Sequence, residues 1–196
     1  MRRGSESKLS AECQPIFGNA LDASTYAGHI APCQTFVQLV GVSHPSPAKA
    51  AEFHAIDRVS ALGAVTAAKE AGVQHFVYLS VAQPAPVMKA YVGVRAECEQ
   101  ALLVSGMNVT ILRPWYVLGP GHRWPYALLP MYWICERIPS TRESARRLGL
   151  VTLEQMVGTL VSAVENPSIG ARFIEVPQIR MGAVHASNPV KTASSA

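Results

Sequence analysis

The stretch that decides the fold is His75–Arg95, with the sequence HFVYLSVAQPAPVMKAYVGVR. It begins with His75–Val81, a run of apolar, β-branched and aromatic residues that is typical of a buried strand. A proline-containing loop, Gln83–Val87, follows, and a helix is expected after it. A buried strand that leads through a loop into a helix is the repeating unit of layered α/β folds.

Three polar side chains in this stretch stand at positions where they could act together. Ser80 stands at the tip of the expected strand, and Tyr91 and Arg95 are four residues apart, on one face of the expected helix. A serine can hold a substrate oxygen, a tyrosine can pass a proton, and a cation can lower the pKa of the tyrosine. The set therefore suits hydride and proton transfer beside a nicotinamide. The same residues also fit a strand, a loop and a helix with a partly buried tyrosine, so both interpretations stay open at this point.

Length and composition indicate one globular domain. The chain has 196 residues, of which 49% are hydrophobic and 15% are charged. Its net charge is +4, without a basic stripe interleaved with aromatic residues, so we expect a small-molecule substrate and no nucleic-acid partner. Oligomeric state does not follow from the sequence.

Cysteine spacing argues against a metal site. None of the cysteines forms a CxxC pair, and no histidine–cysteine group has zinc spacing. The first residues lack the apolar core of a signal peptide, so a cytoplasmic location is expected. The cysteines are Cys13, Cys33, Cys98 and Cys135.

Strands and helices are expected to alternate along the chain. Near-continuous apolar runs indicate strands covered on both faces, as in a parallel sheet. Besides His75–Val81, the expected strands are Gln14–Ala20, Thr35–Val42, Asn108–Trp115 and Arg172–Ile179.

The expected helices are set by capping signals and apolar spacing. Thr152 and Gln155 form a capping-box pattern at the start of one of them. The helices are Ser24–Ile30, Ser46–Ala71 with an apolar stripe of Phe53, Ile56, Val59 and Leu62, Met88–Ser105, and Thr152–Asn166 with Met156, Val157, Leu160, Val161 and Val164 on its buried side. Lys89, just before Tyr91, is expected in a loop.

We expect one domain over residues 1–181, with residues 122–148 as a small cap or lid segment and residues 182–196 as a disordered tail. For the aromatic and arginine-rich part, residues 124–147, three interpretations stay open: a packed lid, a pocket for an apolar or sugar-nucleotide substrate, and a surface that rests on a membrane.

Several of these motifs resemble those of one enzyme family. They are GVQHFVYLS at Gly72–Ser80, YVGVR at Tyr91–Arg95, and ILRP at Ile111–Pro114 running into VLGPG at Val117–Gly121. Together they resemble atypical or extended short-chain dehydrogenases/reductases of the NAD(P)H-binding, NmrA-like and nucleotide-sugar-epimerase-like kind. The resemblance implies a Rossmann-type, doubly wound parallel sheet with the cofactor across the carboxyl ends of the strands.

The resemblance also implies a site that binds NAD or NADP. Its catalytic residues would be Ser80, Tyr91 and Arg95. Its cofactor-binding residues would be Asn19 and Ala20 near the adenine, Val40, Gly41 and Val42 on the adenosine and phosphate side, and Arg113, Pro114 and Val117 at the nicotinamide end.

The sequence departs from the family pattern at single residues. Arg95 replaces the family lysine, and its wide planar guanidinium is a poor substitute for a compact ammonium that holds the ribose hydroxyls. Asn19 stands where the family usually has aspartate, and Asp57 falls where extended members often carry an asparagine in the helix behind the active site.

A larger departure lies at the start of the chain. The family begins with a strand and a glycine-rich turn that cradles the cofactor pyrophosphate, and neither is recognisable here. We therefore expect a domain that lacks the first βαβ unit, with its glycine-rich turn and central strand, as in an N-terminally truncated chain. Such a chain is expected to bind NAD(P) weakly or not at all.

The resemblance implies NAD(P)-dependent oxidoreductase or nucleotide-sugar epimerase/dehydratase chemistry on a small carbonyl or hydroxyl substrate. The alternative is a non-catalytic NAD(P)-binding regulator or assembly protein of the NmrA-like kind. The sequence leaves open the substrate, the preference for NAD or NADP, and whether the chain is an enzyme.

Overall fold

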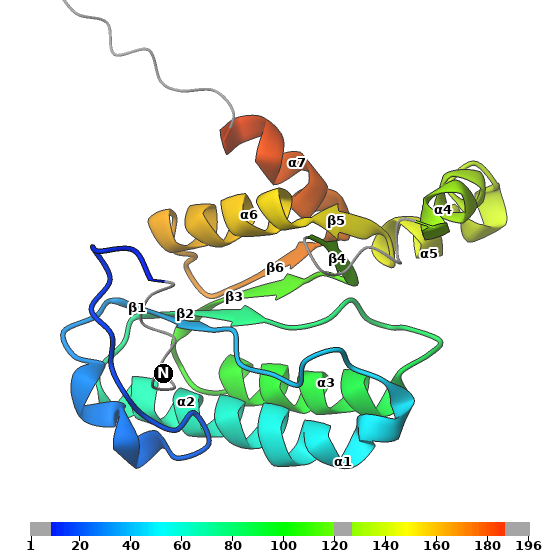
Figure 1. Ribbon diagram of the computed structural model, residues 1–196. Helices are drawn as coiled ribbons and strands as arrows, with labels where there is room; N and C mark the ends of the chain where they lie inside the picture. The colour runs from blue at the N-terminus through cyan, green and yellow to red at the C-terminus, as the bar shows by residue number, and fades with distance from the viewer. Residues whose placement is uncertain (1–8, 120–126, 187–196) are drawn as a thin grey trace, which may run out of the picture.

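A four-stranded parallel sheet forms the centre of the protein (Figure 1). The computed structural model describes residues 9–119 and 127–186. The strand order is β1-β2-β3-β6, with β1 at Thr35–Gln38, β2 at His75–Leu79, β3 at Asn108–Arg113 and β6 at Ala171–Glu175. A second, two-stranded parallel sheet pairs β4, Tyr116–Leu118, with β5, Leu150–Thr152.

Helices cover both faces of the main sheet, which confirms the predicted doubly wound α/β class (Figure 1). Strand alternation divides the core between the two faces: Phe76 and Tyr78 pack in one cluster, and Val77 packs in the other. One face carries α1 (Ala50–Glu52), α2 (Val59–Glu70) and α3 (Lys89–Leu103); the other carries α6 (Leu153–Glu165) and α7 (Val176–Ala186).

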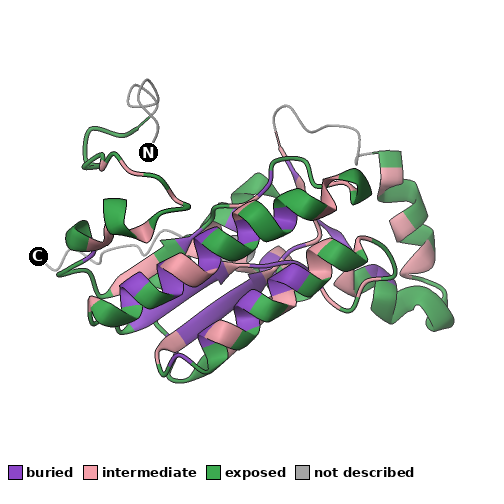
Figure 2. Cartoon of the chain, turned by 90° about the horizontal axis from the view of Figure 1, so that it is seen from below, coloured by how far each residue is buried: buried purple, intermediate pink, exposed green. Residues whose placement is uncertain are grey.

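The two central strands of the sheet, β2 and β3, are deeply buried, and the view onto α2 and α3 shows this buried interior (Figure 2). Two further helices, α4 (Leu129–Cys135) and α5 (Pro139–Arg147), extend away from the sheet (Figure 1). They occupy most of the segment that the sequence predicts as a cap. Residues 120–126, at its start, lie outside the described residues.

The predicted strand at Gln14–Ala20 is wrong. These residues form irregular backbone that ends in a turn, and Phe17 is 46% exposed. Side-chain hydrogen bonds organise this segment locally, because Thr25 Oγ1 accepts from the Asn19 amide at 2.8 Å. A strand needs a neighbour to hold its backbone groups, and none pairs with these residues in the described sheet.

The strand Thr35–Val42 is shorter than predicted, because its pairing with β2 ends at Gln38↔Tyr78. Among the described strands, β1 has only β2 as a neighbour, so it forms an edge. Apolar side chains stay exposed there: Val37 is 38% and Leu39 51% exposed. The sequence of β1 is thus typical of an interior strand, although β1 lies at the edge of the described sheet.

The predicted helix Ser46–Ala71 is present but interrupted. Pro47–Lys49 is a 3₁₀ turn, and Phe53–Arg58 is a π-helical segment between α1 and α2. The wider π turn rotates the following residues, so the predicted apolar stripe holds at Phe53 and half-buried Ile56 but fails at Val59, which is 41% exposed, whereas Ser60 and Ala61 are buried. Small residues, not the predicted large ones, therefore face the sheet.

In α6 the predicted capping box is confirmed, because Thr152 Oγ1 accepts from the Gln155 amide at 3.1 Å and Gln155 Oε1 accepts from the Thr152 amide at 2.8 Å. Its predicted buried side is only partly right. Met156 is buried, whereas Val157 and Val161 are 49% and 48% exposed.

At the C-terminal end, the predicted strand Arg172–Ile179 is divided between β6 and α7. Helix α7 runs on to Ala186, through the first residues of the predicted disordered tail. Residues 187–196 lie outside the described residues.

Candidate active site

Two neighbouring cavities open at the carboxyl ends of the parallel strands. One, of about 630 Å³, is lined by the predicted catalytic residues Ser80, Tyr91 and Arg95. The other, of about 700 Å³, lies at the end of β1. Both are lined by Ser43, so they adjoin. Open α/β sheets bind ligands at this edge.

Ser80 is held rigidly at the tip of β2. Its amide donates to the Leu112 carbonyl at 2.8 Å, which continues the strand pairing with β3 by one residue. Its hydroxyl donates to the buried carboxylate of Glu99 on α3. Glu99 is fixed in turn by an ion pair with Arg113. The Ser80 hydroxyl therefore has one set orientation, with its oxygen at the wall of the cavity.

Tyr91 lies in the first turn of α3, between an aromatic ring and a cation. Its ring is 4.9 Å from that of Phe53, centroid to centroid, and the Arg95 guanidinium carbon is 5.2 Å from the Tyr91 centroid. Burial raises the pKa of the Tyr91 hydroxyl; Arg95 acts to lower that pKa, and Asp57 acts to raise it. At neutral pH Tyr91 is therefore a protonated hydroxyl, which can donate a proton.

Arg95 points into the protein. Its Nη2 donates to Asp57 Oδ1 at 2.5 Å, and its Nη1 donates to the Leu79 carbonyl at 2.7 Å and to the Tyr78 hydroxyl at 3.2 Å. The Asp57 side chain is fully buried, and that of Arg95 is 6% exposed. The pair is thus a buried, hydrogen-bonded ion pair that links the π-helical segment to α3 and to the end of β2.

Asp57 also holds the loop after β1, because its Oδ2 accepts from the Val42 amide at 3.0 Å. Gly41 lies directly against this pair: a side-chain carbon at Gly41 would collide with the Arg95 guanidinium and the Asp57 carboxylate. The π turn places Asp57 where it contacts both Arg95 and the Val42 amide. The aspartate at 57 and the arginine at 95, which both depart from the family pattern, therefore form a pair of opposite charges.

The predicted adenosine-side residues line the second cavity, together with residues of β1. Gln38 is 5% exposed there, and its Nε2 has no hydrogen-bond partner in the described part of the chain. Lys49 adds a positive charge, although its Nζ also donates to the Ser43 carbonyl at 2.7 Å. The predicted residues in this cavity are Asn19, Ala20, Val40, Gly41 and Val42.

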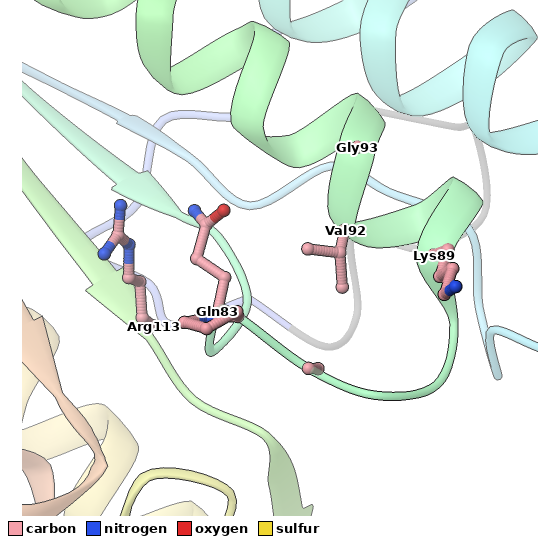
Figure 3. A pocket seen from close by; sticks show the side chains of 7 residues that line it. Gln83, Lys89, Val92, Gly93 and Arg113 are labelled. Carbon is pink, nitrogen blue, oxygen red and sulfur yellow. The ribbon is translucent and has the colours of Figure 1, made fainter.

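At the predicted nicotinamide end, the structure separates the residues. Pro114 and Val117 line the cavity of Ser80 and Tyr91, but Arg113 lines a third cavity of about 490 Å³ beside the loop before α3. Figure 3 shows Arg113 beside Gln83, with Lys89 and Val92 of α3 across the opening. Arg113 bonds Glu99 and Glu175, so its charge is neutralised. Lys89, predicted in a loop, is the first residue of α3.

Sequence reasoning missed Glu99. A usable signal was present: Tyr91, Arg95 and Glu99 follow one another at intervals of four, which places them on one face of α3. His44, Trp115 and Tyr116 line the same cavity as Ser80.

Within residues 9–119 and 127–186, no three histidine, cysteine or acidic side chains gather in a way that could hold a metal ion. None of the helices described is both long and apolar enough to cross a bilayer.

The sequence matches no protein-family model and no curated protein. Solved structures do match. The enzyme WbmH of Bordetella bronchiseptica in complex with NAD+ is 20% identical, with a TM-score of 0.58, over 81% of this chain and 58% of that one. The UDP-N-acetylglucosamine 4-epimerase of Bacillus cereus is 14% identical, with a TM-score of 0.58, over 79% of this chain and 63% of that one.

A short-chain dehydrogenase/reductase superfamily protein from Agrobacterium tumefaciens with bound NAD is 14% identical, with a TM-score of 0.60, over 84% of this chain and 66% of that one. The chain thus spans about three-fifths of the length of these structures. The likeness establishes the fold: the chain has the Rossmann-like architecture of short-chain dehydrogenases/reductases and nucleotide-sugar epimerases, as its motifs predict.

Proposed function

We propose that the protein takes part in NAD(P)-dependent oxidoreductase or nucleotide-sugar epimerase chemistry on a small carbonyl or hydroxyl substrate. The observation that carries this proposal is the meeting of Ser80, Tyr91 and Arg95 at one cavity, at the carboxyl ends of the parallel strands. Solved structures of the same fold with NAD bound support it.

The two polar residues have distinct roles in this proposal. The Ser80 hydroxyl donates its hydrogen bond to Glu99, so its oxygen is free to accept a hydrogen bond from a substrate hydroxyl. Tyr91 is the acid/base. Its raised pKa keeps the proton on the hydroxyl at neutral pH, ready to be donated to a substrate oxygen. Arg95 acts to lower the tyrosine pKa, and its buried partner Asp57 acts to raise it, while burial keeps the net shift upward.

The described residues fit the adenosine and nicotinamide ends of a dinucleotide better than the pyrophosphate between them. The unpartnered Gln38 Nε2 fits a ligand with a hydrogen-bond acceptor in the β1 cavity, and Ser43 joins that cavity to the one of Ser80. Gly41 gives no room to a phosphate, because the space beside it is filled by Arg95. The bound cofactor would supply hydride transfer. We expect weak binding, since Lys49 is the one cation among the described lining residues of the β1 cavity, and Arg95 beside Gly41 is already paired with Asp57.

A titration with NADH and NADPH tests the proposal. A ligand at ten times its dissociation constant stabilises the folded state by about 1.4 kcal/mol, which raises the melting temperature by about 3–6 °C in a chain of this size. We expect such a rise, and we expect Gln38→Leu to reduce it without loss of folding. Absence of any rise up to millimolar dinucleotide would contradict the proposal for this chain.

Turnover separates an enzyme from a regulator. With NAD(H) and UDP-N-acetylglucosamine as a first substrate, Tyr91→Phe should abolish turnover and leave the cofactor-dependent rise in melting temperature intact. Dinucleotide binding with no turnover in either variant, across a panel of nucleotide sugars and small carbonyl compounds, would favour the non-catalytic regulator.

A further inference from the structure

The helical hairpin of residues 129–147, which joins α4 to α5, exposes an unusual density of apolar side chains. Trp133 is 60% exposed and Ile134 53% exposed. Three further large side chains, at 43–50% exposure, accompany them: Leu129, Met131 and Ile138. A cluster of this kind at one projecting end of a molecule marks an interaction surface.

Four of the apolar residues form two adjacent rows on one side of α4, and Met131 lies outside these rows. Leu129 and Trp133 are four residues apart, and Pro130 and Ile134 form the adjacent row at the same spacing. Arg137 continues the first row, and its guanidinium carbon is 3.3 Å from the centroid of the Trp133 ring. A cation therefore stands at the edge of the apolar face.

The hairpin is also positively charged. It contains four arginines and two glutamates, and Glu136 is already paired with Arg180 of α7 at 2.9 Å. Arg142 and Arg146 are exposed on α5. The Arg142 guanidinium is tethered near α4, because its Nε donates to the Glu136 carbonyl at 3.1 Å. Cations and apolar side chains thus lie together on one projecting unit.

The described residues of the hairpin do not line the candidate active site, although Tyr132 interacts with Trp115 and Tyr116 of its wall. The cavity of Ser80 and Tyr91 is lined by Trp115 and Tyr116, and by no described residue of the hairpin. In Figure 1 the hairpin extends away from the sheet, and in Figure 2 it is mostly exposed. Of the interpretations open from the sequence, a lid and a pocket wall therefore have less support in the described residues than an outward-facing surface.

We propose that the hairpin of residues 129–147 docks on an anionic phospholipid surface. Trp133 and Ile134 enter the boundary between headgroups and acyl chains, and Arg137, Arg142 and Arg146 lie at the lipid phosphates. An apolar row bordered by arginines matches such a surface in both polarity and charge, whereas an acidic protein surface would match the charge alone.

Co-sedimentation of the full chain with vesicles tests the proposal. We expect binding to phosphatidylcholine vesicles that contain phosphatidylglycerol, weak binding to phosphatidylcholine alone, and a loss of binding as salt is raised. Arg142→Gln with Arg146→Gln should weaken the binding about thirtyfold, because each basic residue near an anionic membrane contributes about 1 kcal/mol.

A matched pair of variants distinguishes this face from general stickiness. Trp133→Ser with Ile134→Ser should abolish vesicle binding. Val157→Ser with Val161→Ser removes two apolar side chains of 49% and 48% exposure from α6, and should leave binding unchanged.

Three results would overturn the proposal: no binding to anionic vesicles, equal loss in both variant pairs, or a concentration-dependent dimer that the Trp133→Ser/Ile134→Ser pair dissociates. The last would assign the face to a second copy of the chain. None of these outcomes depends on dinucleotide binding or turnover.

Discussion

The buried pair of Asp57 and Arg95 should be the most sensitive point of the fold. Removal of one partner leaves the other charge buried and uncompensated, which typically costs about 3–5 kcal/mol. Asp57→Asn keeps an oxygen that can accept from the Val42 amide, so we expect the lower end, about 3 kcal/mol. That corresponds to a fall in melting temperature of about 6–12 °C.

Arg95→Met should cost as much or more, because it strands a carboxylate that is fully buried. The double variant leaves no charge in the site. Its loss in unfolding free energy should therefore be smaller than the sum of the two single losses by at least about 2 kcal/mol.

Urea unfolding, with a common slope for all variants, measures these differences. Arg58→Gln serves as the control: it breaks the ion pair with Glu97, in which the side chains are 46% and 55% exposed, and should cost less than about 1 kcal/mol. The reasoning is refuted if Asp57→Asn costs no more than this control, or if the single losses add within about 0.5 kcal/mol in the double variant.

Three other perturbations have expected outcomes. Gly41→Ala forces a side-chain carbon into the same ion pair and should cost about 2–4 kcal/mol by urea unfolding, whereas a change below about 0.5 kcal/mol would show that the pair can move aside. Val77→Ala, in the fully buried centre of β2, should lower the free energy of unfolding by about 2–3 kcal/mol, whereas Val37→Ala, at a position on β1 that is 38% exposed, should lower it by less than about 1 kcal/mol. Equal losses in the two variants would mean that the β1 edge is covered in solution. Burial and the charge of Arg172 lower the pKa of His75. As pH falls below about 6.5, the unfolded chain therefore binds a proton that the folded chain does not bind, and the free energy of unfolding should drop by up to about 1.4 kcal/mol per pH unit. His75→Gln should flatten that slope in unfolding curves taken from pH 7.5 to 5.5.

Local sequence signals predicted much of the chain because they act over a few residues. The capping box at Thr152 and the end of the helix at Ala71, just before Gly72 with its positive φ, depend on neighbours in sequence. The sequence also predicted that Ser80, Tyr91 and Arg95 would share a cavity, because the end of a strand and the first turns of the next helix always lie close together.

Whether an apolar segment forms a strand could not be decided from the residues of that segment alone. Gln14–Ala20 has an apolar pattern similar to that of a strand, but a strand is stable only when a neighbour pairs its backbone groups. The buried face of α2 was predicted with errors for a related reason. One π turn shifts every later residue around the helix axis, and only packing reveals it.

The sequence by itself determined a parallel α/β sheet and brought a serine, a tyrosine and a cation to its carboxyl edge, because these depend on alternation and spacing. Only the tertiary structure decided which group the cation, Arg95, interacts with. Asp57 and Arg95 are 38 residues apart in the chain, yet they form a buried ion pair. The same structure tied Ser80 to Glu99 and left residues 129–147 out of the lining of the Ser80 cavity, since long-range contacts are set by packing and not by local pattern.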